Sequence, residues 1–437
     1  MATPLHLIRF LIVLLAVCAA QAGWQNAAPA AAGRVSTDLL SAATAKKKTT
    51  TRKKKTVAKK TTTAKKTTAR KTTARKTVSK KSSTTTAASR SSSRSRVSRS
   101  RSRRSVARHS PWAVPTYADS TLGDNVDGDD LVIRRAAVSA LGRYNGAVVV
   151  ADPRSGRILS IVNQNTAVEK AYIPCSTVKV PVAMAAMSEG AINATTTVRV
   201  VGKNTMTFTE AMARSNNVYF ERVGANLGFE KLASYHRLWG LGEKATLNLE
   251  NEHPGVIPPA PPANGGAARM SSFGEGIQLT ALQLASLLSA ISNGGTLYYL
   301  QYPQNQEEVA SFVPRVKRYL DIYPFLDDLK QGMSGAVNFG TARRAAFSEE
   351  ASLFGKTGTC TDYPQKTHMG WFGSFVKKGN SELVVVVMLT GANGVSGPVA
   401  SGVAGKLYSN LDESGYFEQP MRYSPVALID RGGVPNE

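Results

Sequence analysis

Three short motifs follow one another along this chain, and together they contain the side chains that acyl transfer needs. They are S-T-V-K at residues 176–179, S-N-N at 215–217 and K-T-G-T at 356–359. In the first motif, the three-residue spacing places an amine one helical turn from a serine hydroxyl. A serine hydroxyl becomes a strong nucleophile only when a neighbouring base takes its proton. The set therefore predicts a reaction that passes through an acyl-serine.

The first two motifs and a second lysine supply the proton transfers of such a reaction. We predict Ser176 as the nucleophile and Lys179 as its base. A lysine accepts a proton only when it is neutral, so its pKa must fall through burial and through nearby positive charge such as Lys356. Ser215 is expected to relay a proton to the leaving amine, and the amide of Asn217 to hydrogen-bond the peptide of the substrate.

The K-T-G-T motif is expected to bind the substrate. Lys356 and the hydroxyls of Thr357 and Thr359 would hold a substrate carboxylate by charge and hydrogen bonds. Gly358 has no side chain, so it would let the acyl group approach the strand backbone. The backbone N–H groups of Ser176 and Thr359 would form an oxyanion hole.

Each motif alone is a weak signal. S-x-x-K is common by chance, and S-F-V-K at residues 374–377 also fits it. We interpret 374–377 as strand surface, because its pattern alternates and lacks helical spacing. Taken singly, Ser176 would cap a helix, Ser215 would lie in a turn and Lys356 would be a solvated charge. The order of the motifs and their small and apolar flanks favour the catalytic interpretation.

Hydrophobic periodicity predicts the elements that position these residues. A helix beginning at Ser176 would place its hydroxyl at the positive end of the helix dipole. A second helix is expected at 280–291, and strands are expected at 145–152, 155–162, 369–376 and 382–389. The K-T-G-T motif would lie on the strand before the last two. This order indicates a mixed α/β domain whose sheet uses both chain ends and is covered by helices.

The basic charge of the chain is concentrated in one tract. Of 55 Lys and Arg residues, 25 lie within residues 46–108, which contain no acidic residue. The other 30 basic residues balance 30 Asp and Glu, so the net charge of +25 belongs to the tract. The tract has almost no large apolar residue to bury, and we predict that residues 23–111 are disordered.

A polycation of this kind binds polyanions. We predict that the tract adheres to anionic envelope polymers or lipid headgroups, with a simple solvated linker as the alternative. DNA would bind it in a test tube, but the run contains no aromatic residue for base stacking. Export of the chain also argues against nucleic acid as the partner in vivo.

The first residues have the pattern of a secretory signal. His6 and Arg9 precede the apolar run 10–20, and small residues allow cleavage after Ala22. The run is short for a membrane span, although an uncleaved anchor is the alternative. We expect residues 1–22 to be a signal peptide. The chain would then reach the periplasm or the outer face of the cytoplasmic membrane, where disulfides persist.

From about residue 130 to residue 411, the chain resembles the transpeptidase domain of penicillin-binding proteins. Besides the three motifs, the resemblance rests on residues 240–243, 252–258, 274–280 and 370–372. It implies a β-lactamase/transpeptidase-like fold over residues 112–437, with an antiparallel sheet covered by helices plus an all-helical subdomain. It also implies a serine D,D-transpeptidase that cross-links peptidoglycan stem peptides ending in D-Ala-D-Ala and that is inhibited by β-lactams.

Two cysteines flank the motifs in a way that is similar to class A carbapenemases. Cys175 precedes the predicted nucleophile, and Cys360 lies two residues after Gly358. Catalysis requires the helix start and the K-T-G-T strand to be neighbours, and the carbapenemases carry a disulfide across this position. The resemblance therefore implies a Cys175–Cys360 disulfide that braces the floor of the site, with two buried free thiols as the alternative.

Other activities of the superfamily stay open. A class A β-lactamase needs a glutamate in an E-x-x-L-N arrangement, but Glu243 precedes Leu247 by one residue too many. Glu252 and Glu275 are expected to be structural. A D,D-carboxypeptidase, a non-enzymatic β-lactam sensor and a wall-binding protein are further alternatives. The five His residues show no metal-ligand spacing, so we expect no metal and no cofactor, and His368 is expected to be structural.

Overall fold

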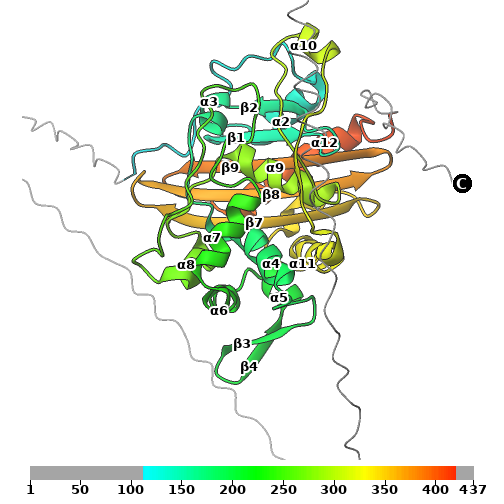
Figure 1. Ribbon diagram of the computed structural model, residues 1–437. Coiled ribbons are helices and arrows are strands. Elements are labelled where there is room, and N and C mark those ends of the chain that lie inside the picture. The colour runs from blue at the N-terminus through cyan, green and yellow to red at the C-terminus, as the bar shows by residue number, and fades with distance from the viewer. Residues whose placement is uncertain (1–111, 420–437) are drawn as a thin grey trace, which may run out of the picture. The chain divides into compact units, whose positions relative to one another are not determined.

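The computed structural model describes residues 112–419. At the centre of these residues is a five-stranded antiparallel sheet (Figure 1). Its strand order is β2-β1-β9-β8-β7. The strands are β1 (Gly146–Ala151), β2 (Ile158–Val162), β7 (Ser352–Asp362), β8 (Thr367–Lys378) and β9 (Ser381–Gly391). Both ends of the described chain contribute to the sheet, as predicted, because β1 pairs directly with β9.

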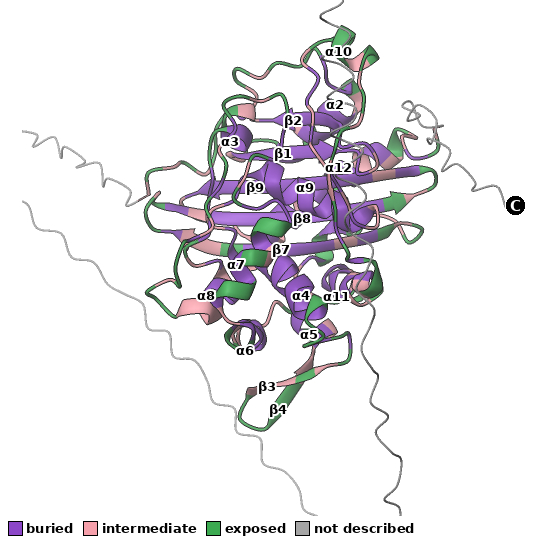
Figure 2. Ribbon diagram, viewed as in Figure 1, coloured by how far each residue is buried: buried purple, intermediate pink, exposed green. Residues whose placement is uncertain are grey.

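Helices cover both faces of the sheet and create two apolar cores. On β9, Val386 packs into one core with α9 (Ala281–Ser292), whereas Val385 and Val387 belong to the other core. That second core contains α2 (Leu131–Leu141) and α12 (Gly397–Glu413). A strand that is buried on both faces is apolar throughout, which explains the unbroken run of valines in β9. Figure 2 shows this burial along the central strands.

A mainly helical subdomain lies beside β7 and carries two of the motifs (Figure 1). It contains α4 (Lys179–Ser188), α5 (Phe208–Ala213), α6 (Asn217–Leu227), α7 (Phe229–Leu238) and α8 (Gly266–Phe273). The subdomain is not all-helical as expected, because β3 (Thr197–Val201) and β4 (Asn204–Thr207) form a hairpin. Alternating exposed and half-buried residues with β-branched side chains favour a strand over a helix in β3.

The two predicted helices form with one difference. The helix expected at 280–291 is α9, which begins with a capping box between Thr280 and Gln283. The helix expected to begin at Ser176 instead starts with a 3₁₀ turn, η1 (Cys175–Val178), and continues as α4 from Lys179. The left-handed backbone of Cys175 does not fit an α-helix, and the turn is closed by a hydrogen bond from the Thr177 N–H to the Pro174 carbonyl at 3.2 Å.

Shorter elements complete the described residues. They are α3 (Gln164–Val168), β5 (Thr296–Tyr298), α10 (Gln306–Ala310), β6 (Val316–Tyr319), η2 (Tyr323–Phe325), α11 (Leu326–Asn338) and η3 (Arg343–Ala345). Within 112–419, no helix has the length and apolar character to cross a membrane. The predicted signal peptide and basic tract lie outside the described residues.

Candidate active site

The predicted nucleophile lies in a turn that is tied to the sheet. Ser176 is the second residue of η1, directly after Cys175. Cys175 has a φ of +52°, a left-handed conformation that costs a non-glycine residue about 1–3 kcal/mol. A disulfide joins it to Cys360 of β7, with the Cα atoms 5.5 Å apart. The predicted disulfide is therefore confirmed, and the alternative of two free thiols is wrong.

The amine of Lys179 lies at the centre of the motifs. Its Nζ is 2.6 Å from Ser176 Oγ, 2.7 Å from Asn217 Oδ1 and 2.8 Å from the carbonyl oxygen of Ser272. Ser215 Oγ lies 3.5 Å away. Lys179 is fully buried at the start of α4. The structure thus brings the S-T-V-K and S-N-N motifs together around one amine.

The surroundings of Lys179 favour its neutral form. Burial is the main cause that holds its pKa well below that of a free lysine, and the positive charge of Lys356 lowers the pKa further. The charge of Glu221 acts in the opposite direction. Burial also lowers the pKa of Lys356, to about 7. A neutral amine in contact with a serine hydroxyl is the arrangement required of a general base.

Ser215 lies between the two lysines. Its Oγ is 2.8 Å from Lys356 Nζ, in addition to its contact with Lys179. Ser215 has a φ of +56° in the turn between α5 and α6. The next residue, Asn216, caps α6 by accepting a hydrogen bond from an N–H of its first turn. A continuous chain of contacts therefore runs from the nucleophile through one lysine and Ser215 to the other lysine.

Gly358 is needed for the nucleophile turn to approach β7. A Cβ at this position would lie 2.9 Å from the carbonyl oxygen of Pro174 and 3.2 Å from Cys175 Cβ. Lys356 and Cys360 share this side of the strand, since residues two apart face the same way. From the sequence, Gly358 is expected to let the substrate approach the strand. In the structure, it makes room for the turn that carries Ser176.

The two threonines of the K-T-G-T motif have different surroundings. Thr357 is 3% exposed, and its hydroxyl oxygen lies 2.5 Å from that of Thr341. Thr359 is exposed, and its Oγ1 accepts the N–H of Gly397 at 2.7 Å. That bond leaves the hydroxyl proton of Thr359 able to point toward a ligand. Of the two threonines expected to hold a carboxylate, Thr359 is the one that is exposed.

Residues 146–409 match the family model of the penicillin binding protein transpeptidase domain. The chain belongs to this family. The matched residues contain all three motifs and every strand of the sheet, and the resemblance stated from the motifs is confirmed.

Relatives of this transpeptidase domain are similar at low identity. Stage V sporulation protein D of Bacillus subtilis is 26% identical over 70% of this chain and 56% of that protein. Peptidoglycan D,D-transpeptidase MrdA of Haemophilus influenzae is 24% identical over 62% of this chain and 54% of that protein. The chain therefore spans about half the length of these curated relatives.

A solved structure shows the same fold. It is Pseudomonas aeruginosa PBP2 in complex with WCK 5153, which is 21% identical to this chain and superposes with a TM-score of 0.55. The match covers 66% of this chain and 77% of that one. The expected transpeptidase-like architecture, an antiparallel sheet covered by helices, is confirmed.

Three groups around the motifs of the transpeptidase domain were not predicted. They are the Ser272 carbonyl, the carboxylate of Glu221 one helical turn after Asn217, and the hydroxyl of Thr341. For the Ser272 carbonyl, the sequence offers one indirect indication: the glycine at 274 is typical of a residue that ends a helix. A backbone carbonyl is present at every residue, so its type and spacing carry no information about this contact.

Ser374 of the second S-x-x-K and His368 lie on β8 and have structural contacts. Ser374 is fully buried in the sheet, with its Oγ 2.9 Å from Tyr408 Oη. The ring of His368 lies 3.9 Å from that of Trp112, and its Nδ1 is 3.0 Å from Thr361 Oγ1. The interpretation of 374–377 as strand is confirmed, but its placement at the surface is wrong, because residues 374–376 are buried between the two cores and only Lys377 is exposed. The contacts of His368 agree with a structural role.

The three glutamates considered as deacylating bases have other partners. Glu252 accepts hydrogen bonds from two backbone N–H groups at 2.9 and 2.7 Å, and from the hydroxyl of Thr246. Glu275 forms an ion pair with Arg269 at 3.5 Å. Glu243 forms ion pairs of 2.9 and 2.5 Å with Lys317 and Arg318 of β6. Each contact agrees with a structural role.

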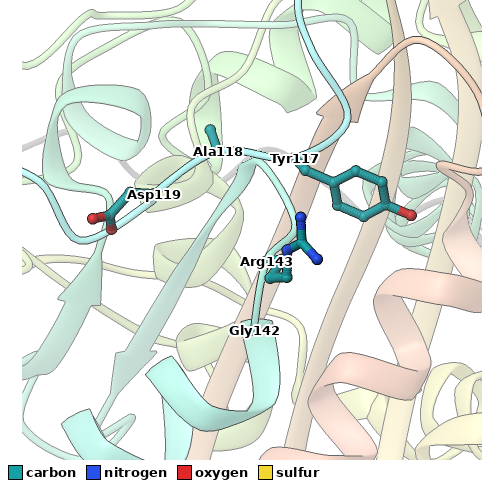
Figure 3. Close-up of a pocket in the computed structure, with 5 residues that line it drawn as sticks. All are labelled: Tyr117, Ala118, Asp119, Gly142 and Arg143. Carbon is teal, nitrogen blue, oxygen red and sulfur yellow. The ribbon is translucent and has the colours of Figure 1, made fainter.

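A hollow of about 430 Å³ lies where α2 ends and the chain turns toward β1 (Figure 3). The guanidinium of Arg143 lies 5.7 Å from the ring centroid of Tyr117. The lining residues are Tyr117, Ala118, Asp119, Gly142 and Arg143, and none belongs to the motifs. Within residues 112–419, no group of three or more His, Cys, Asp or Glu side chains is arranged to hold a metal ion.

Proposed function

We propose that this chain is a serine D,D-transpeptidase that cross-links peptidoglycan stem peptides through an acyl-enzyme on Ser176. We propose that β-lactams acylate the same residue. The observation that carries the proposal is the 2.6 Å contact between Ser176 Oγ and the buried amine of Lys179. The family and a relative named as a peptidoglycan D,D-transpeptidase support the reaction class.

In the first half-reaction, Lys179 removes the proton of Ser176, and Ser176 Oγ attacks the carbonyl carbon of the penultimate D-Ala. The new C–O bond creates an oxyanion, which the backbone N–H groups of Ser176 and Thr359 stabilise. The C–N bond to the terminal D-Ala then breaks, and the proton that Lys179 took from Ser176 passes through Ser215 to the leaving amine. Lys356 and Thr359 hold the carboxylate of the terminal D-Ala throughout.

In the second half-reaction, the amine of a neighbouring stem peptide attacks the acyl carbon and displaces Ser176 Oγ. The proton that the attacking amine loses passes through Lys179 to Ser176 Oγ, and a new peptide bond joins the two stems. In a β-lactam, the C–N bond that breaks lies inside the ring, so the amine stays attached to the acyl group. It therefore blocks the acceptor position, and the acyl-enzyme persists.

Transfer to an amine is favoured over rapid hydrolysis. A β-lactamase or D,D-carboxypeptidase would need a base that activates water against the acyl carbon. The contacts of Glu243 and Glu252 described above engage both carboxylates with other groups of the domain. These contacts support the transpeptidase.

We also propose that the transpeptidase domain extends over residues 112–437, that the chain is exported and that it works in the periplasm or at the outer face of the cytoplasmic membrane. Residues 46–108 would bind anionic envelope polymers or lipid headgroups there. Residues 23–437 should sediment with anionic lipid vesicles or with isolated cell-wall polymer, and a variant lacking 46–108 should not. Equal sedimentation of the two proteins would contradict this role of the tract.

The enzymatic proposal is tested by incubating the purified protein with benzylpenicillin and following its intact mass. A stable adduct is expected, and Ser176→Ala should remove it completely. Ser374→Ala is the matched control, because it alters the serine of the second S-x-x-K motif and should leave acylation intact. An adduct that disappears within seconds while drug is consumed would identify a β-lactamase. Absence of any adduct would contradict the assignment of Ser176.

Cross-linking is tested separately with a donor stem pentapeptide and an amine acceptor. The expected product is the cross-linked dimer, with release of D-Ala. Release of D-Ala without dimer would identify a D,D-carboxypeptidase instead.

A further inference from the structure

The C-terminal end of α8 contacts both the base and the nucleophile turn. The last four carbonyl groups of an α-helix have no partner within the helix. One of them, the Ser272 carbonyl, accepts a hydrogen bond from Lys179 Nζ at 2.8 Å. Two residues later, Gly274 packs against Pro174 so closely that a Cβ would lie 2.5 Å from its ring. The position of this helix end therefore determines the surroundings of the base.

The partners of Lys179 orient its lone pair. A neutral lysine amine has two N–H bonds and one lone pair. The Ser272 carbonyl and Asn217 Oδ1 accept hydrogen bonds and have no proton to donate, so they take the two N–H groups. The lone pair then remains for the third close contact, Ser176 Oγ at 2.6 Å. This is the orientation that removes a proton from the nucleophile.

Glu221 holds the carbonyl group of Ser272 through the side chain of the same residue. Ser272 is fully buried, and its Oγ donates to Glu221 Oε1 at 3.2 Å. The helices α6 and α8 pack closely here, since a Cβ on Gly224 would lie 1.9 Å from Ser271 Oγ. A displacement of Glu221 would therefore be transmitted to the Ser272 carbonyl.

We propose that Glu221 is a positioning residue for acylation, which fixes the Ser272 carbonyl against Lys179 and balances the charge of Lys356. The inference rests on the proposed function, because it assumes that Lys179 promotes acylation of Ser176. It adds two groups, one carboxylate and one backbone carbonyl, to those that the three motifs contain.

Two charged side chains act on Lys179 from the elements packed around α4, namely Lys356 on β7 and Glu221 on α6. Several other charged or titratable groups on these elements have partners elsewhere: Arg269 with Glu275, Lys231 with Glu189, His236 with the Leu232 carbonyl, Lys330 with the Phe375 ring and Asp328 with the Ala194 N–H. Three more, Arg222, Glu230 and Asp327, are exposed to solvent. Removal of the Glu221 charge would leave Lys356 unopposed, so the pKa of Lys179 would fall.

The test is the pH profile of the acylation rate with benzylpenicillin. Glu221→Gln removes the charge but keeps an oxygen that accepts from Ser272 Oγ. Its acidic limb should move to lower pH by about half a unit or more, since less of Lys179 is protonated. The matched control is Glu230→Gln, which removes an exposed carboxylate from the first turn of α7 and should leave the profile unchanged.

Two further variants separate positioning from general damage to the fold. Ser272→Ala keeps the carbonyl but removes the hydroxyl, and acylation should slow roughly tenfold at every pH because one buried hydrogen bond is lost. Glu221→Asp keeps the charge and should return the acidic limb toward that of the wild type. Thermal melts of each variant report whether it is folded.

An unshifted profile for folded Glu221→Gln would overturn the charge balance, and an unchanged rate for Ser272→Ala would overturn the positioning. An aspartate variant that shifts as far as the glutamine variant would also contradict the proposal. Failure of the proposed function gives different results: without acylation of Ser176 the wild type itself would form no adduct, whereas a β-lactamase or D,D-carboxypeptidase would be revealed by adduct lifetime or by release of D-Ala without dimer.

Discussion

The strand side and the helical side of this active site are held by different means. On the strand side, β7 pairs with β8 without interruption from Ser352 to Asp362, and the K-T-G-T motif lies within this ladder. On the helical side, the reacting groups lie at the ends of elements: Ser176 in η1, Ser215 between α5 and α6, and the Ser272 carbonyl near the end of α8.

The difference follows from how backbone groups are paired. A ladder satisfies the backbone of each strand through regular hydrogen bonds, so the strand presents its side chains on a rigid support. Helix ends leave backbone groups unpaired, and those groups are available for chemistry. The positions of these helix-end groups then depend on a few specific contacts. We therefore expect single substitutions to have their largest effect where the helical side fits against the strand side.

Gly358→Ala should have the largest effect, because it acts where the two sides touch. The new Cβ would meet the Pro174 carbonyl at 2.9 Å, so the nucleophile turn must move. We expect acylation to slow roughly 100-fold and the free energy of unfolding to fall by about 1–3 kcal/mol. Gly402→Ala on α12 is the matched control, since its nearest contact would be 3.6 Å. Wild-type acylation by Gly358→Ala would show that the two sides are not tightly fitted.

Loss of the disulfide should have the next largest effect. The double variant Cys175→Ser/Cys360→Ser removes the covalent link between η1 and β7. We expect the free energy of unfolding to fall by about 2–5 kcal/mol, because the link constrains the unfolded chain. Acylation should slow about tenfold, since the left-handed turn loses its brace. Denaturant unfolding and penicillin labelling measure both, and equal values for variant and wild type would argue against a bracing role.

The charge of Lys356 should make substrate binding on the strand side depend on pH. With a pKa of about 7, Lys356 is positively charged below that pH and neutral above it. For a substrate with a free carboxylate, kcat/KM should fall several-fold above pH 7, and Lys356→Arg should flatten this fall. A substrate whose carboxylate is amidated is the control. If kcat/KM for the amidated substrate falls in the same way, the group that titrates near pH 7 does not bind the substrate carboxylate.

His236 on the helical side should affect the stability of the domain and leave acylation unchanged. It is fully buried on α7, and burial lowers its pKa from 6.5 to about 4. The folded chain keeps this histidine neutral, whereas the unfolded chain protonates it below pH 6.5. The free energy of unfolding should therefore fall by about 3 kcal/mol between pH 6.5 and 4.

For His236→Phe, the free energy of unfolding measured with urea should depend less on pH between 6.5 and 4. The variant should be acylated at the wild-type rate at pH 7. The same slope in the variant as in the wild type would assign the acid sensitivity to other groups.

The amino-acid sequence determined the features that depend on local pattern. The apolar runs at 369–376 and 382–389 predicted β8 and β9, because strands that are buried on both faces are rich in apolar residues. The helical pattern of apolar residues at 280–291 predicted α9. The three motifs, in their order, named the side chains that the structure brings together around Lys179. The cysteine pairing needed the resemblance to a known family as well.

The tertiary structure alone decided what lies between distant segments. It placed Thr357 against Thr341, left Thr359 exposed, and showed that Gly358 makes room for the nucleophile turn. It also brought the Ser272 carbonyl to Lys179. These contacts join residues that are far apart in the chain, and they depend on how helices and sheet pack. A backbone carbonyl has no residue type to mark it, so its role becomes visible only when the fold has placed it.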